Sequence, residues 1–214
     1  MIEKLECPLC GRSKSKHYHR DARRDYFCCA ECHLVFIPPD QRLNIIEEKA
    51  VYDQHQNKPD DPDYRKFLAQ IFAPVCAHIK PPARGLDFGS GPGPTLSLMF
   101  LEAGYNMAIY DPVYAPDESA FKSEYHFITA TEVFEHLFFP GKEIERLTSI
   151  LKPGGWLGVM TSRIPTELKF SDWHYIRDPT HVCFYTEKTF YWIASRYNLR
   201  LNYSGNDVYL LQKK

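Results

Sequence analysis

Four cysteines near the start of the chain have the spacing of a metal site. Cys7 and Cys10 form one CxxC pair, Cys29 and Cys32 form a second, and eighteen residues separate the two pairs. A CxxC turn points two sulfurs at one ion, and a hairpin of this length returns the second pair to complete a tetrahedron. The pattern predicts a structural Zn²⁺ bound by these four thiolates in a zinc-ribbon module over residues 1–39.

The same module allows an alternative role in RNA binding. Residues 17–24 are rich in His and Arg, and residues 1–39 hold seven Lys and Arg against five Asp and Glu. Four thiolates and one Zn²⁺ cancel this excess, so we favour a hairpin that folds around zinc and packs on the main domain. Cys28 is interpreted as a packed thiol, with replacement of Cys29 as a ligand as the alternative.

A glycine-rich motif, Asp87-Phe-Gly-Ser-Gly-Pro-Gly93, stands near the middle of the chain. It follows a short strand (85–88) and precedes a helix (95–103), and the next strand (107–110) ends at Asp111. Glycines let the backbone approach a ligand, the helix N-terminus faces it, and an acid after the second strand can accept from two ribose hydroxyls. An acid two residues before the first glycine favours a nucleoside with an ammonium group over a pyrophosphate.

The motif and its surroundings resemble the class I S-adenosylmethionine-dependent methyltransferases. Residues 127–137 are similar to the family's fourth strand and its exit, and residues 151–161 to its turn into the fifth strand. The resemblance covers residues 64–212 and implies an α/β fold with a Rossmann-like sheet and S-adenosylmethionine as cofactor. Together with a zinc ribbon, it is similar to a subset of sugar, quinone and ribosomal RNA methyltransferases.

The resemblance also implies cofactor-binding residues. Asp87 would orient the glycine loop or contact the methionine ammonium, Gly89 and Gly91 would line the methionine, and Asp111 would hold the ribose. Only seventeen residues separate Asp111 from Thr129, so the family's third strand is expected to be missing and its adenine pocket rebuilt. The expected set is Asp87, Phe88, Gly89, Ser90, Gly91, Gly93, Tyr110, Asp111, Pro112, Thr129 and Ala130.

Methyl transfer needs few protein groups, because the sulfonium is already activated and alignment does most of the work. A base is needed where the nucleophile is a hydroxyl or a carbon acid, and the candidates are Glu132, Glu135, His136 and His181. Residues 132–136 look like a segment that binds a divalent metal in the plant small-RNA 2′-O-methyltransferase and the ubiquinone-pathway O-methyltransferases. The resemblance thus implies Mg²⁺ as an alternative to a metal-free base.

A long connection over residues 163–185 is predicted to be a substrate lid. It has few periodic apolar residues, and long loops in compact domains are often functional. Arg177 would bind an anionic substrate or pair with Asp178. The expected substrate contacts are Trp173, His174, Arg177 and Tyr185.

The elements that must hold these groups divide the chain into three parts. The ribbon ends at residue 39, an acidic connector fills 40–63, and the methyltransferase domain occupies 64–214 with a core of its own. Helical periodicity begins at Tyr64, Thr186 caps a second helix, and two strands (199–203 and 208–212) close the sheet.

Composition limits the function classes. The chain has 214 residues, 44% hydrophobic, with a net charge of -1, which excludes global disorder and argues against a mainly electrostatic nucleic-acid binder. The sequence has no apolar run of about 20 residues and no apolar signal segment, so we expect a cytoplasmic protein without a membrane partner. We therefore expect a methyltransferase for a small-molecule acceptor. The alternatives are an RNA methyltransferase that uses its ribbon, and a non-catalytic methyltransferase-like binding protein.

Overall fold

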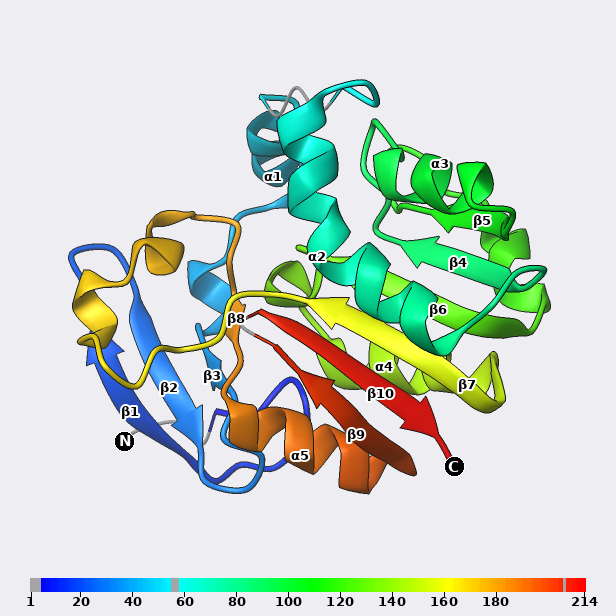
Figure 1. Ribbon diagram of the computed structural model, residues 1–214. Coiled ribbons are helices and arrows are strands. Elements are labelled where there is room, and N and C mark those ends of the chain that lie inside the picture. Colours follow the sequence, from blue (N-terminus) through cyan, green and yellow to red (C-terminus); the bar gives the residue numbers. More distant parts are fainter. Residues whose placement is uncertain (1–4, 55–57, 206) are drawn as a thin grey trace.

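A mixed sheet forms the centre of the computed structural model, which describes residues 5–54, 58–205 and 207–214 (Figure 1). In this part of the chain six strands lie in the order β5-β4-β6-β7-β10-β9. The first four are parallel, and β10 runs antiparallel to β7 and β9, so the expected α/β fold is confirmed. The strands are β4 (Arg84–Phe88), β5 (Asn106–Tyr110), β6 (Tyr125–Thr131), β7 (Leu151–Met160), β9 (Leu199–Ser204) and β10 (Val208–Lys213).

Strand β5 is an edge of this sheet, where the family's third strand was expected to be missing. Between Asp111 and β6 the described chain forms a 3₁₀ helix over Glu118–Lys122 and no strand that joins the sheet. The segment is too short for a strand with a crossover, so the shortened sheet follows directly from the sequence.

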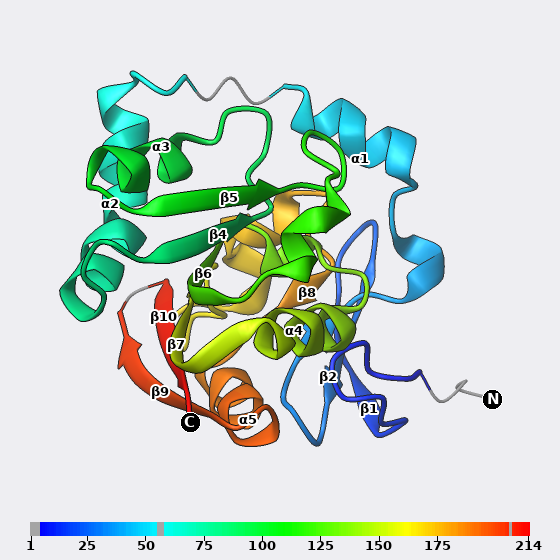
Figure 2. The ribbon, with the colours of Figure 1, turned by 90° about the vertical axis from the view of Figure 1, so that its right-hand side faces the viewer.

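Helices cover both faces of the sheet. Helices α2 (Pro62–His78) and α3 (Thr95–Glu102) pack on one face, around Phe127 and Leu210. Helices α4 (Pro140–Ser149) and α5 (Glu187–Arg196) pack on the other face, with Ile128 and Leu157 in their core (Figure 2). Neighbouring residues of a strand point to opposite faces, so Phe127 and Ile128 enter different cores.

The N-terminal segment does not have a core of its own. Its hairpin, β1 (Ser15–Arg20) and β2 (Asp25–Cys29), continues through β3 (Val35–Phe36) into β8 (Cys183–Phe184) of the main domain. Strand β3 pairs with β8, and Phe36 shares one apolar cluster with Phe184. The expectation of separate cores is therefore wrong, because this small sheet buries its apolar face only by packing on the main domain.

The segment 40–63, expected to be a connector, contains the helix α1 (Ile45–Tyr52). Asn44 begins it with a capping box, in which its side chain accepts from the Glu47 amide and the Glu47 side chain accepts from the Asn44 amide. Figure 2 shows α1 beyond the carboxyl ends of β4 and β5. Among the described residues, no helix has the length and apolar character to cross a membrane.

Candidate functional site

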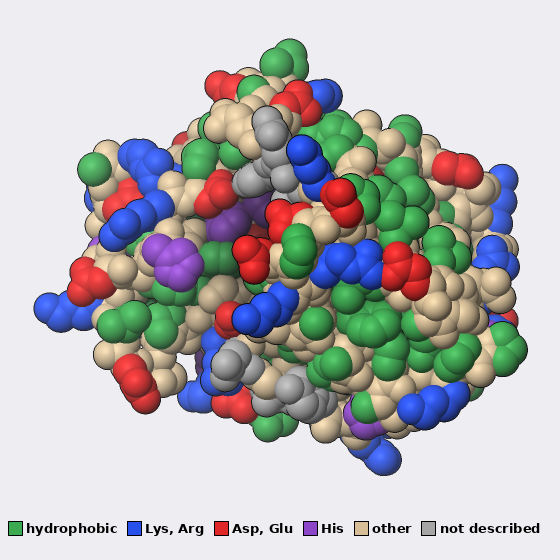
Figure 3. All heavy atoms as spheres, turned by 45° about the horizontal axis from the view of Figure 1, so that its top comes forward, with side chains coloured by type: hydrophobic (Ala, Val, Ile, Leu, Met, Phe, Trp, Pro, Cys, Tyr) green, Lys and Arg blue, Asp and Glu red, His purple; other side chains and the backbone are tan. Residues whose placement is uncertain are grey.

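A cavity of about 610 Å³ opens at the carboxyl ends of the parallel strands. Its walls come from α1, from α2, from the loops after β4, β5 and β6, and from Asp178 and His181. Figure 3 shows a hollow in this face that contains histidine side chains, with acidic side chains beside it. In open α/β sheets, ligands bind in this crevice, where the chain crosses from one side of its first strand to the other.

The glycine loop after β4 forms the floor of the cavity. The amides of Gly89 and Ser90 donate to the carbonyl oxygen of Tyr110 at 2.7 and 3.2 Å, which ties the loop to the end of β5. Gly89 has φ +77°, and a Cβ there would lie 2.3 Å from Cγ2 of Val133. Gly91 has φ +63° and open space where its Cβ would be. The loop is thus held in one shape with backbone exposed to the cavity.

Asp111 is fixed at the end of β5 by three backbone amides. Its Oδ2 accepts from Gly91 at 3.0 Å, and its Oδ1 accepts from Val113 at 2.8 Å and Tyr114 at 3.0 Å. The side chain is buried but lines the cavity. Because three donors hold it, the carboxylate has one orientation before any ligand binds.

Eight of the expected cofactor residues line this cavity, and three do not. Asp87 is buried, and it accepts from Thr129 Oγ1 at 2.9 Å and from Ser97 Oγ at 3.2 Å. Burial raises the pKa of Asp87 to about 6. Asp87, Thr129 and Ala130 therefore lie in the sheet, and the expected direct contacts are corrected to a network beneath the loop. The eight are Phe88, Gly89, Ser90, Gly91, Gly93, Tyr110, Asp111 and Pro112.

Two histidines face the cavity with the same nitrogen. Nδ1 of His136 lies 3.2 Å from the carbonyl oxygen of Thr180, and Nδ1 of His181 lies 2.8 Å from that of Tyr175. A carbonyl only accepts, so each Nδ1 donates and each neutral ring keeps a free lone pair on Nε2. The ring centroids are 4.8 Å apart, and burial lowers the pKa of His181. Both rings are thus prepared to accept a proton.

Two glutamates complete this end of the site but differ in position. Glu132 lines the cavity with φ +52°, and burial, reinforced by the nearby Glu135, raises its pKa to about 9. Glu135 is fully buried and does not line the cavity. It accepts from Thr161 Oγ1 at 2.8 Å and from the hydroxyl of Tyr175. Of the four expected catalytic residues, Glu132, His136 and His181 reach the cavity.

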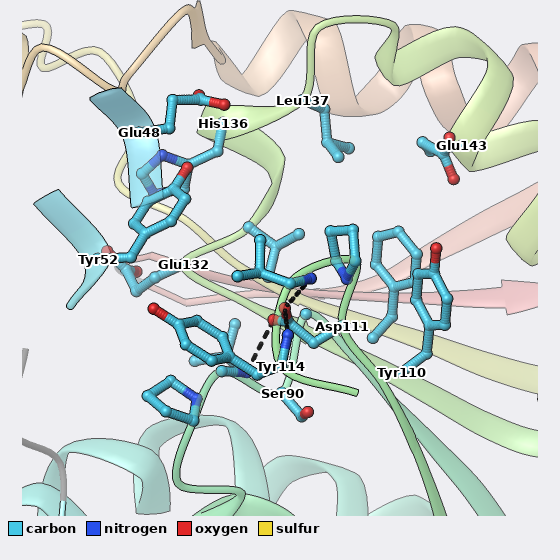
Figure 4. Close-up of a pocket in the computed structure, with 18 of the residues that line it drawn as sticks. Glu48, Tyr52, Ser90, Tyr110, Asp111, Tyr114, Glu132, His136, Leu137 and Glu143 are labelled. Atoms are coloured by element: carbon cyan, nitrogen blue, oxygen red, sulfur yellow. Dashed lines mark hydrogen bonds between the residues drawn. The ribbon is translucent and has the colours of Figure 1, made fainter. Parts of the chain in front are cut away.

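Helix α1 supplies site residues that the sequence interpretation missed. Tyr52 packs edge-on against His136, with ring centroids 5.4 Å apart, and Glu48 lines the same wall. Burial raises the pKa of Glu48 to about 7. Figure 4 shows Glu48, Tyr52 and His136 at one end of the cavity, Tyr110 at the other, and Asp111 between them. The Asn44–Glu47 capping box was the available sequence signal for this helix.

The four expected substrate contacts do not line the cavity. Trp173 and Tyr185 are buried in the core, where the Tyr185 hydroxyl donates to the carbonyl oxygen of Phe134 at 3.0 Å. His174 and Arg177 are exposed outside it. The segment instead contributes Asp178 and His181. The correction has a simple cause, because the aromatic residues here complete the core shared with β1–β3.

The four expected zinc ligands lie together. The Sγ atoms of Cys7, Cys10, Cys29 and Cys32 are all within 4.8 Å of one another, and the Cys7–Cys32 and Cys10–Cys29 pairs are 3.5 Å apart. A tetrahedron with Zn–S bonds of about 2.3 Å has edges of about 3.8 Å, so the cluster is compatible with zinc. Cys28 lies outside this group, and its Sγ contacts the carbonyl oxygen of Cys29 at 3.7 Å.

The comparisons with known proteins agree with this geometry. A family model described as a methyltransferase domain matches residues 54–203, which is more than half of the chain. The chain belongs to this family. A search of curated proteins found no match.

Solved methyltransferase structures share the fold. The 1,6-didemethyltoxoflavin-N1-methyltransferase of Burkholderia thailandensis, solved with S-adenosylhomocysteine, has a TM-score of 0.55 at 16% identity and covers 93% of this chain and 99% of its own. DesVI of Streptomyces venezuelae has a TM-score of 0.54 at 11% identity, over 81% of this methyltransferase and 100% of DesVI. CalO1, a methyltransferase of calicheamicin biosynthesis, has a TM-score of 0.52 at 12% identity, over 79% and 58%.

Proposed function

We propose that this methyltransferase transfers the methyl group of S-adenosylmethionine to a small molecule. The observation that carries the proposal is the fixed carboxylate of Asp111 beside the open backbone of Gly91. In this arrangement Asp111 accepts from the two ribose hydroxyls, and the glycine loop lies along the methionine. Tyr110 and Pro112 then border the adenine, in the place left by the missing third strand.

The end of the cavity with His136 is the acceptor site of this proposal. The acceptor's nucleophilic atom bonds to the methyl carbon, the carbon–sulfur bond breaks, and the bonding electrons stay on sulfur. The proton lost by the acceptor goes to Nε2 of His136 or His181. Glu132, neutral below its raised pKa, donates a hydrogen bond to the acceptor.

A divalent cation is the second candidate at this place. A carboxylate oxygen of Glu135 and one nitrogen from each of His136 and His181 lie within 4.8 Å of one another. Two imidazoles and one carboxylate suit a transition metal better than Mg²⁺. We favour the metal-free base, because Thr161 and Tyr175 already donate to the Glu135 carboxylate.

The charges of the cavity support an acceptor without phosphate or carboxylate groups. No Lys or Arg is among the described residues that line the cavity, whereas Glu48, Glu132 and Asp178 line its acceptor side. The nearby Arg42 donates to the carbonyl oxygen of Phe138, away from the cavity. An anion here would meet acidic groups without a cation, which is costly. This feature disfavours RNA as the acceptor.

Calorimetry with S-adenosylhomocysteine tests the cofactor site. We expect Asp111→Asn to weaken binding by about 1.5–3 kcal/mol, because the new amide meets backbone N–H donors and a charged acceptor is lost. Asp178→Asn is the matched control, since it removes a carboxylate from the acceptor side only. Equal affinity of wild type and Asp111→Asn would contradict the proposed site.

Labelled methyl transfer separates the proposal from its alternatives. Matched aromatic alcohols, amines and carboxylates, together with RNA, would be offered as acceptors with labelled S-adenosylmethionine. We expect labelled alcohol or amine products. Labelled RNA would favour the RNA methyltransferase, and tight cofactor binding without any product would favour the non-catalytic binding protein.

We also propose that Cys7, Cys10, Cys29 and Cys32 bind a structural Zn²⁺. Their sulfurs offer four thiolate ligands with no room for substrate, which is the pattern of a structural site. Metal analysis of protein purified without chelator is expected to give one equivalent of zinc.

A further inference from the structure

A buried arginine of the N-terminal hairpin holds the segment that delivers His181 to the cavity. Arg24 lies in the turn between β1 and β2, and only 6% of its surface is exposed. Its Nη1 donates to the carbonyl oxygens of Pro179 at 3.1 Å and His181 at 2.9 Å. Its Nη2 donates to those of Ile176 at 2.7 Å and Asp178 at 3.1 Å.

The turn that carries Arg24 is itself fixed. Oδ1 of Asp21 accepts from the amides of Arg23 at 2.6 Å and Arg24 at 2.7 Å, and Oδ2 of Asp21 accepts from the Tyr26 hydroxyl at 2.7 Å. Arg23 adds a further bond, from its Nη2 to the carbonyl oxygen of Arg177 at 3.0 Å. The guanidinium therefore projects from a rigid base.

The clamped segment has little regular structure to hold it. A short 3₁₀ helix ends at Arg177, and β8 begins only at Cys183. Its backbone carbonyls point to Arg24, while its side chains Asp178 and His181 line the cavity. A buried guanidinium must have partners for its N–H groups, so these contacts fix the position of the segment.

The same segment also orients the second histidine. The Thr180 carbonyl oxygen is the partner of Nδ1 of His136, and the Val182 amide donates to the carbonyl oxygen of Glu135 at 2.8 Å. A displacement of residues 176–181 would therefore change His136 as well as His181. The glycine loop and Asp111 make none of their described hydrogen bonds to this segment.

We propose that Arg24 is a positioning residue, through which the N-terminal hairpin holds the acceptor side of the site and leaves the cofactor side independent. The inference rests on the proposed function for the assignment of the two sides, but the clamp itself is testable without an acceptor. It gives the hairpin a role in the fold that does not need RNA, because the guanidinium of Arg24 is occupied by the protein's own carbonyls.

Hydrogen–deuterium exchange on the full chain tests the clamp directly. Arg24→Ala is expected to raise exchange by about tenfold or more in the peptide 174–182, because the opening of a local segment sets exchange there. The peptide 85–93, which holds the glycine loop, should keep its wild-type rate. Arg20→Ala is the matched control, since Arg20 is an exposed arginine of the same hairpin that pairs with Asp25.

Arg24→Lys protects the test against general unfolding. A lysine keeps the charge but cannot reach four carbonyls with a planar fork, so we expect a smaller rise confined to 174–182. Unchanged exchange of 174–182 in both variants, or an equal rise in 85–93 in both, would overturn the proposal.

Two further measurements distinguish this inference from the proposed function. S-adenosylhomocysteine affinity should change less than twofold in Arg24→Lys, while kcat for an acceptor falls at least about tenfold. A matching loss of cofactor affinity would overturn the independence of the two sides. If wild-type protein binds no cofactor, the proposed function fails, and the exchange result still decides the clamp.

Discussion

Nδ1 of His136 lies 3.2 Å from the carbonyl oxygen of Thr180, although 44 residues separate them in sequence. This contact makes His136 Nδ1 a donor and leaves Nε2 as the basic atom toward the cavity. It also joins the exit of β6 to the segment held by Arg24. The protonation state of the site is therefore set by a backbone atom that no local sequence motif contains.

This relationship predicts separate losses for the two histidines. His136→Ala and His181→Ala should each lower kcat by roughly 10²–10⁴ if that residue is the base, and less if it only supports the other. Labelled methyl transfer at saturating cofactor measures the effect. His174→Ala is the control, because His174 is exposed on the same segment outside the cavity. Full turnover in both single variants would contradict the histidine base.

The cofactor side was predictable because its residues are contiguous. The motif from Asp87 to Gly93 fixes a strand, a turn and a helix in one stretch, and Asp111 follows at the end of the next strand. Parallel pairing of β4 with β5 then places the two ends side by side. Local patterns were enough, although they did not show that Asp87 would turn into the sheet.

The acceptor side was less predictable because tertiary contacts decide it. The aromatic residues Trp173 and Tyr185 were natural candidates for a lid, but the core shared with the hairpin takes them. Glu48 and Tyr52 belong to a polar helix with no buried residue, so no apolar periodicity marked it. Arg24 lies 157 residues from His181, a separation that no motif spans.

The glycine loop predicts unequal costs for two alanine substitutions. Gly89→Ala combines φ +77° with a Cβ 2.3 Å from Val133, whereas Gly91→Ala has φ +63° and open space. We expect Gly91→Ala to cost about 1–2 kcal/mol from backbone conformation alone, and Gly89→Ala to cost more. Urea unfolding measures both free energies. The double variant Gly89→Ala/Val133→Ala should recover part of the loss, and no recovery would show that the Val133 contact is unimportant.

Asp87 predicts a dependence of stability on pH. Burial raises its folded pKa to about 6, above the usual value of about 3.9. The folded state then holds a proton that the unfolded state releases, so stability falls as pH rises from about 4 to 6 and stays lower above that range. Asp87→Asn should flatten this slope and stabilise the protein at pH 7 by up to about 3 kcal/mol. Urea unfolding between pH 4 and 8 measures it, and an unchanged slope would contradict the assignment.

Removal of zinc should affect the whole molecule, because the cysteine cluster and the main domain share one core. Cys7, Cys29 and Cys32 belong to the same apolar cluster as Leu86 and Phe184. Cys10→Ser is expected to lose the metal and lower the melting temperature in a single transition, since zinc binding is coupled to folding. Cys28→Ser is the matched control, because Cys28 lies outside the cluster of four sulfurs. Metal analysis and calorimetric melting check both variants. A Cys10→Ser protein that unfolds in two steps, with its main domain at the wild-type melting temperature, would show that the two parts are independent after all.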